Sequence, residues 1–359
     1  MNNASRRTHY PYRLPYPYVE LLLALALLAA LALALSQGTL PISTHTLLSE
    51  LLSKWPPISS PTAITSAHLV LWHIRLPRAL LAACIGALLA LCGTVTQSLF
   101  RNPLADPSLI GISAGASAGA SLAIAFGTTL NLATPLTTVW GISRISFGAA
   151  IGGLGAVLLV YRIATRQGVT AITTLLLAGL AVSTFVSSLT QLLSLFSDDT
   201  TWRRLSLWHL GNIQNATLTQ VSLTTLILGG LLCFFLRSHR SLDALLLGTE
   251  SAFSLGVKTQ QLQRRLILAV AIGVGITVTF AGIIAFIGLM VPHCLRWFVG
   301  PTHKRLLISS ALGGALLLVL SDTAARTVLA PHELPVGLLT TLLGAPFFIL
   351  LLVQAPHVH

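Results

Sequence analysis

The sequence predicts an all-α polytopic membrane protein, and its composition is the first reason. Of the 359 residues, 54% are hydrophobic and only 8% are charged, and the mean hydropathy is +0.83. So few charged side chains cannot cover a soluble globule with solvated surface. The second reason is that apolar runs of about 20 residues, the length of a membrane-spanning helix, recur along the chain.

Ten apolar spans account for most of the chain. In order they are 19–37, 79–99, 109–126, 147–164, 172–195, 218–236, 266–287, 290–299, 306–322 and 336–353. The first lacks a convincing small-residue cleavage site, so we expect it to be retained as a helix. The span at 290–299 is short: a re-entrant or absent segment would reverse the sidedness of the two later spans, whereas a tilted or broken helix buried in protein would not.

The distribution of basic residues predicts the orientation. If both termini are cytoplasmic, 14 of the 21 Lys and Arg lie on that side and seven lie outside, as the positive-inside rule favours. The net charge of +12 does not indicate nucleic-acid binding, because the basic residues are scattered between apolar blocks and form no stripe.

No convincing catalytic or metal-binding motif is present in the sequence. The four cysteines lie in or beside apolar segments without C-x-x-C spacing, which is typical of small buried side chains. None of the three lysines follows a G-x-x-x-x-G frame, so active transport would need an ATPase partner or an ion gradient. The G-x-S-x-G match at 111–115 lies in an apolar helical pattern rather than a strand-to-helix turn, so it does not predict a nucleophile.

Two stripes of small residues lie in the segment 111–121. Gly111, Gly115 and Gly119 recur every four residues, a spacing that allows close approach of another helix. The second stripe, on another face of the same helix, consists of Ser113, Ser117 and Ser121. It is compatible with a polar path and equally with hydroxyls that bond back to their own helix.

The segment "RNPLADP" at 101–107 interrupts the apolar runs. Pro103 and Pro107 stop helix continuation and bias Asn102 and Asp106 towards extended backbone. In the orientation predicted from charge, the segment is a cytoplasmic turn between the second and third spans.

The segment 237–265 is too polar to span a membrane but has an apolar side. Gly248 and Gly256 should divide it into two short helices. The apolar side suits a groove on another protein or, alternatively, the lipid headgroups. It consists of Leu242, Leu245, Leu246, Phe253 and Leu255.

Three arginines fall on the outer side, where the charge rule disfavours them. Arg75 and Arg78 are three residues apart and share a helix face, and Arg326 follows Asp322 by four residues. Bidentate pairing with carboxylates of a partner protein is one role. An internal pair between Arg326 and Asp322 is the other, and both roles are compatible at different stages of a cycle.

Four segments, at 75–116, 242–257, 281–307 and 333–352, resemble the permease family of bacterial ATP-binding-cassette importers for iron-siderophores, haem and vitamin B12. The resemblance implies a permease domain over 19–353, with a cytoplasmic N-terminal tail at 1–18 and a C-terminal tail at 354–359. It further implies a homodimer around a central translocation path in the inner membrane. Two cytoplasmic ATPase subunits, which alone would bind ATP-Mg, and a periplasmic binding protein would complete the importer.

The resemblance also implies roles for particular residues. Asn102 and Leu104 would be gate residues, with Thr173 a second constriction, and the alternative for the loop is a sharp turn without a gating role. The segment at about 241–264 would couple to the ATPase, and Arg75, Arg78 and Arg326 would meet carboxylates of the binding protein.

The cargo is expected to be haem, with a ferric siderophore or vitamin B12 as the alternative. The segment 160–212 looks more like the haem branch of the family, although "LGNIQNA" departs from it. His73 and His209 near the outer mouth are candidate contacts to haem iron or ordinary interface residues. A secondary transporter would need ionisable residues near the membrane centre, and these are scarce.

Overall fold

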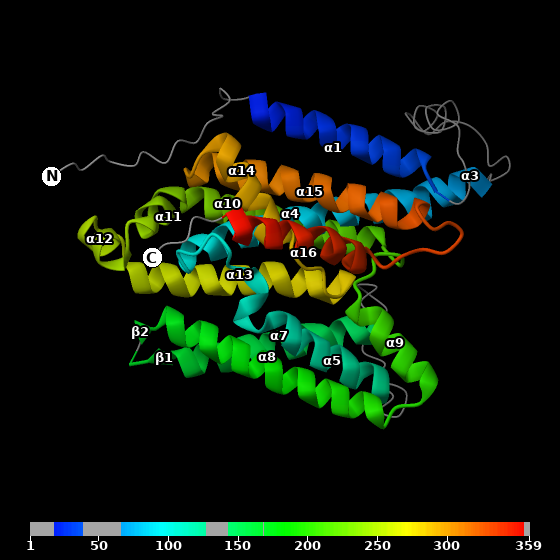
Figure 1. The fold of residues 1–359 in the computed structure, drawn as a ribbon, viewed down its shortest axis with the longest axis horizontal. Helices are drawn as coiled ribbons and strands as arrows, with labels where there is room; N and C mark the ends of the chain where they lie inside the picture. Colours follow the sequence, from blue (N-terminus) through cyan, green and yellow to red (C-terminus); the bar gives the residue numbers. More distant parts are fainter. Residues whose placement is uncertain (1–17, 39–65, 127–142, 168, 355–359) are drawn as a thin grey trace.

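The protein is described by a computed structural model covering residues 18–38, 66–126, 143–167 and 169–354 (Figure 1). Seven helices in this part of the chain are long and apolar enough to cross a membrane: α1 (Tyr18–Ser36), α4 (Leu76–Leu99), α7 (Arg144–Ala164), α8 (Ile172–Leu195), α10 (Leu218–Arg237), α13 (Thr259–Ala281) and α15 (His303–Thr327). Three shorter apolar helices join them: α5 (Ile112–Phe126), α14 (Ile287–Val299) and α16 (Val336–Gln354). These ten helices coincide with the ten expected spans, so the predicted all-α membrane class is confirmed.

Short elements lie at the two ends of the bundle (Figure 1). One end, here called the α12 end, carries α11 (His239–Leu246), α12 (Thr249–Ser254) and the hairpin of β1 (Thr165–Arg166) and β2 (Val169–Thr170). The opposite end, here called the α9 end, carries α3 (Ser66–Leu69), the π-helical turn η1 (Val70–Arg75) and α9 (Asp199–His209).

Helix α4 is the centre of the bundle. In its most apolar window 83% of the residues are buried, against 17% for α8. It packs against α10, α13, α14 and α15, while α5, α7 and α8 form a second group on the far side of α13 (Figure 1). Helix α4 is therefore enclosed by other helices, whereas α8 leaves most of its surface uncovered.

Glycines set the closest helix contacts. A Cβ at Gly93 of α4 would lie 1.8 Å from the carbonyl oxygen of Gly288 in α14. In the second group, a Cβ at Gly119 of α5 would lie 2.0 Å from the carbonyl oxygen of Gly148 in α7. Backbones meet directly at both crossings, and the expected stripe containing Gly115 and Gly119 predicts the second of them.

The third span starts later than its hydropathy suggests. Residues 107–110 form a 3-10 turn, η2 (Pro107–Ile110), capped by the Asp106 carboxylate, which accepts a hydrogen bond from the backbone N–H of Ser108 at 2.8 Å. Gly111 has a φ of +85° and ends this turn, so it lies before α5 and is not part of the helical stripe.

The chain between α13 and α15 crosses the bundle through a short helix. Gly282, with a φ of +69°, ends α13 beside Trp208 at the α9 end. His303 begins α15 at the α12 end, where its backbone N–H donates to Asp243 of α11. The irregular segment 283–286 and α14 connect these ends, so the short eighth span is a crossing helix and not an absent one.

Candidate functional site

A polar cavity of about 290 Å³ opens at the α9 end between α5, α8 and α9. Helix α8 contributes hydroxyl and amide groups at helical spacing, so one polar face of this apolar helix meets the cavity. The residues that line the cavity are Ser117, Ser187, Thr190, Gln191, Ser194, Trp202, Leu205, Ser206 and His209.

His209 is the titratable group of this polar cavity. The Ser117 hydroxyl oxygen lies 3.4 Å from its Nδ1 and 3.3 Å from its Nε2. Burial lowers the pKa of His209, so the imidazole is neutral at physiological pH. The ring also meets Trp208 edge to face, with 5.8 Å between the ring centroids. A neutral imidazole beside hydroxyls can both donate and accept hydrogen bonds.

The structure separates the other residues expected near this mouth. Ser113 is half-buried on α5 and His73 is exposed on η1, and neither lines the polar cavity. Ser121 is buried, and its hydroxyl has no hydrogen-bond partner. No cluster of three or more His, Cys, Asp or Glu among the described residues could hold a metal ion. The polar path interpretation therefore applies best to Ser117.

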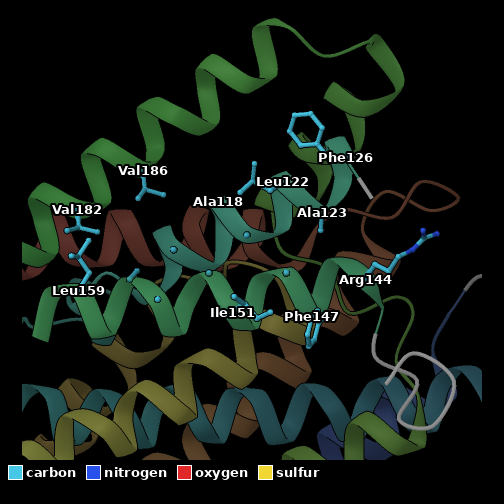
Figure 2. Close-up of a pocket in the computed structure, with 16 residues that line it drawn as sticks. Ala118, Leu122, Ala123, Phe126, Arg144, Phe147, Ile151, Leu159, Val182 and Val186 are labelled. Carbon is cyan, nitrogen blue, oxygen red and sulfur yellow. The ribbon is translucent and has the colours of Figure 1, made fainter. Parts of the chain in front are cut away.

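A larger groove of about 570 Å³ lies between α5, α7 and α8 (Figure 2). Side chains such as Leu122, Ile151 and Val186 line it, and Arg144 lies at one end (Figure 2). Because this lining is otherwise apolar, the groove suits hydrocarbon and offers little to a polar chelate. The polar cavity beside it is therefore the better candidate site.

The three outer arginines are buried, with 3–5% of their surface exposed. Arg75 Nη1 donates to the carbonyl oxygens of Leu35 at 2.7 Å and Ser36 at 3.0 Å, and Arg326 Nη2 donates to that of Ala34 at 3.1 Å. These carbonyls belong to the last turn of α1, where a helix lacks intrahelical donors and its dipole favours cations. Two arginines therefore cap α1.

Arg78 and Arg326 share a buried carboxylate. Arg78 Nη2 lies 2.9 Å from Asp322 Oδ1 and Arg326 Nε lies 3.4 Å from Asp322 Oδ2. Arg78 Nη1 also pairs with Glu333 at 2.9 Å. Burial raises the pKa of Glu333, but the hydrogen bond and charge of Arg78 outweigh it and hold that pKa below its usual range. Of the two roles considered from the sequence, this structure contains the internal one.

The predicted two short helices are present at the α12 end, separated by Gly248 with a φ of +111°. Their apolar residues do not form one outward side as expected. Leu242 and Leu245 are 0% and 3% exposed and pack into the bundle, because α11 lies against α4 and α15. The outward surface, here called the exposed patch, consists of Leu246, Leu247, Phe253 and Leu255.

The loop 101–107 lies at the same end. Asn102 is exposed, and its Oδ1 accepts a hydrogen bond from the backbone N–H of Leu104 at 2.9 Å. Thr173 is exposed in the first turn of α8, next to β2. The expected gate residues thus share the α12 end.

Sequence reasoning missed α9 and the polar face of α8. Asp198 caps α9 by accepting a hydrogen bond from the backbone N–H of Thr201 at 3.4 Å. The run of polar residues after 196, which contains this N-cap residue, could have indicated the start of a helix. Ser187, Thr190 and Ser194 repeat at spacings of three and four, the signature of one helix face.

A bundle of apolar helices with a polar cavity at one end and an exposed amphipathic segment at the other defines a polytopic membrane permease. The chain belongs to the FecCD transport family, whose model matches residues 25–354. This confirms the family predicted from the four sequence segments.

Relatives in this family are named for the transport of different cargoes. The haemin transport system permease HmuU of Yersinia pestis is 42% identical over 300 residues, which cover 81% of this chain and 86% of that protein. The cobalamin import permease BtuC of Halobacterium salinarum is 40% identical, covering 80% of this chain and 74% of its own. The iron(3+)-hydroxamate import permease FhuG of Bacillus subtilis is 37% identical, covering 80% and 84%.

A solved structure has the same fold. It is an inward-facing conformation of a metal-chelate type ABC transporter, 30% identical, with a TM-score of 0.79. The match covers 94% of this chain and 100% of that one.

Proposed function

We propose that this chain is the permease subunit of a binding-protein-dependent ABC importer that moves haem across the bacterial inner membrane by ATP-driven alternating access. The observation that carries the cargo is the 42% identity, over 81% of the chain, to a permease named for haemin transport. Relatives named for hydroxamate and cobalamin import make a ferric siderophore or vitamin B12 the second candidate.

The uneven burial of the helices supports a homodimer around a central path. Helix α8 is largely uncovered in one chain and carries the polar face at the cavity. The cavity of about 290 Å³ is at the lower limit of the roughly 300–1,000 Å³ typical of ligand pockets. A second copy facing the same axis would enlarge it, with Ser117 and His209 of each copy facing the cargo.

The energy would come from two partner ATPases, because the sequence has no phosphate-binding loop of its own. We place the α12 end and both termini in the cytoplasm, as the basic residues favour. The exposed patch then faces the ATPase, and Asn102, Leu104 and Thr173 narrow the inner mouth of the path. A periplasmic binding protein would deliver cargo at the α9 end.

Reconstitution in proteoliposomes tests this function. The chain, its ATPase and its binding protein should take up haem only with ATP, and the chain alone should hydrolyse none. Uptake driven by an ion gradient without ATP would identify a secondary transporter instead. Uptake of cobalamin or a ferric hydroxamate in place of haem would change the cargo and leave the importer class intact.

The exposed patch gives a sharper test of the ATPase contact. Phe253 is 70% exposed in the isolated chain, so Phe253→Asp should not disturb the bundle. In an interface, a desolvated unpaired carboxylate costs several kcal/mol, so uptake should fall more than about tenfold. Phe253→Leu is the matched control and should retain uptake. Normal uptake by Phe253→Asp would favour a segment that lies on the lipid headgroups.

A further inference from the structure

Three side chains from three separate elements form a hydrogen-bonded chain at the α12 end. His303 begins α15, and its Nδ1 lies 2.6 Å from Asp243 Oδ1 of α11. On its other side, Nε2 of His303 contacts the hydroxyl oxygen of Ser98 in the last turn of α4. The same Asp243 oxygen accepts the backbone N–H of His303 at 2.9 Å. His303 and Ser98 are each 1% exposed.

The direction of the hydrogen bond between His303 and Asp243 follows from the charge of Asp243. Burial raises the pKa of Asp243, but hydrogen bonds from His303 outweigh it and hold that pKa below its usual range. The carboxylate is therefore ionised and accepts Nδ1–H of His303. On the other side of the ring, Nε2 faces the Ser98 hydroxyl, whose own proton is donated to the carbonyl oxygen of Thr94. Hydrogen bonds to an ionised group are shorter and stronger than neutral ones.

The order Ser–His–Asp is that of a hydrolytic triad, but the position excludes that chemistry. Ser98 lies inside α4, where its hydroxyl is also 3.0 Å from the carbonyl oxygen of Thr94. Ser98 and His303 are almost fully buried, and neither lines any of the five best-formed cavities in the described part of the chain. With no room for a substrate, the three residues can act only on the elements that they join.

The last turn of α4 is also tied to α14. Gln97 Nε2 donates to the carbonyl oxygen of Leu289 at 3.0 Å, and Arg296 Nη2 donates to Gln97 Oε1 at 2.9 Å. The carbonyl oxygen of Gln97 in turn accepts the backbone N–H of Asn102, near the start of the loop 101–107, at 3.0 Å. Whatever displaces this turn therefore displaces the start of that loop.

We propose that Asp243, His303 and Ser98 are positioning residues that transmit movement of α11 and α12 to the end of α4 and the loop 101–107. The inference rests on the proposed function, in which an ATPase moves α11 and α12 and the loop 101–107 narrows the translocation path. Asp243 is the one member on the moving segment, and His303 joins it to both α15 and α4. Displacement of α11 must then carry both helix ends with it or break two hydrogen bonds.

Apolar packing is the competing route for the same movement. Leu242 and Leu245 of α11 are buried in the bundle beside Asp243. If they alone transmit the movement, removal of the polar chain should lower stability without changing the number of ATP molecules hydrolysed per cargo. The two routes thus predict different numbers of ATP molecules hydrolysed per cargo molecule in variants that lack the polar chain.

The test uses the full importer in proteoliposomes, with ATP hydrolysis and uptake measured in the same vesicles. Ser98→Ala and Asp243→Asn should each raise the ATP hydrolysed per cargo at least about tenfold, with co-purification of the ATPase unchanged. The double variant should be no worse than either single variant, because one chain is broken in all three. Thr94→Val is the matched control: its hydroxyl is equally buried in α4 but donates to Ala90 O of its own helix.

Spin labels give a readout that does not depend on the uptake rate. Leu255 and Asn102 are both exposed, one on each side of the linkage. On ATP binding, a label at each position should move in the wild type, and in Ser98→Ala only the label at 255 should move. An unchanged ratio, or movement of both labels in Ser98→Ala, would overturn the linkage. Absence of ATP-dependent uptake in the wild type would instead refute the proposed function.

Discussion

Replacement of Asp322 by Ala should be among the most damaging changes to the stability of this protein. Arg78, Arg326, Asp322 and Glu333 form a cluster with two positive and two negative charges, a net charge of zero. Asp322→Ala changes the net charge of this cluster to +1, at a position where the carboxylate and both arginines are at most 5% exposed. Breaking a buried ion pair by removing one partner costs about 3–5 kcal/mol.

The free energy of unfolding can be measured by titrating a denaturing detergent into the protein held in a mild one. Glu333→Gln is the graded control, because the Glu333 side chain is 27% exposed and a partly solvated pair contributes only about 1 kcal/mol. Replacement of Arg78 by Met together with Asp322 by Leu should recover part of the loss, since it returns the net charge of the cluster from +1 to zero.

A loss below about 1 kcal/mol for Asp322→Ala would refute the reasoning. Arg78 and Arg326 would then not depend on their internal partner, and they would be available to carboxylates of a binding protein. In that case charge reversal of Arg78 should weaken binding-protein affinity, and the wild-type on-rate should fall with rising salt.

Three further predictions concern packing, capping and pH. Gly93→Ala should cost about 1–3 kcal/mol or more by forcing α4 and α14 apart, whereas Gly229→Ala should cost nothing, because no atom lies within 4 Å of its Cβ position. Thr217→Ala should cost about 1 kcal/mol in the same detergent titration, because it removes the capping box with Gln220, and Thr217→Ser should restore it. Because the pKa of Glu333 is lowered in the folded protein, its contribution is complete above the unfolded value of about 4.3 and disappears as pH falls through the folded value. The thermal midpoint of the wild type should therefore fall more on acidification below about pH 5 than that of Glu333→Gln; equal slopes would contradict this.

The membrane helices could be predicted from the sequence because a single strong signal determines them. Burial of the backbone in hydrocarbon demands long apolar helices, and a hydropathy window detects them without tertiary information. The start of α5 could not be placed this way, since it depends on the Asp106 cap and the left-handed Gly111. An 11-residue amphipathic helix such as α9 is likewise invisible to a window that averages hydropathy.

The polar contacts show where sequence reasoning stops. The pair of Arg326 and Asp322 is four residues apart and could be seen in the helical spacing. Arg78 and Asp322 are 244 residues apart, and their pairing depends on the crossing of α4 and α15. The same holds for Leu242 and Leu245, whose inward direction is decided by the helices that lie against α11.

The direct backbone contact of α5 with α7 limits how this molecule can move. Gly115 and Gly119 face Gly148 and Gly152, and the side chains that reach these contacts are the methyl groups of Ala123 and Ala156. An interface of glycine backbone and alanine methyl groups has no rotamers to rearrange, so sliding or tilting would separate the two backbones. Helices α5 and α7 therefore behave as one rigid unit. A change in the shape of the polar cavity then has to come from motion of α8 or α9 relative to this unit.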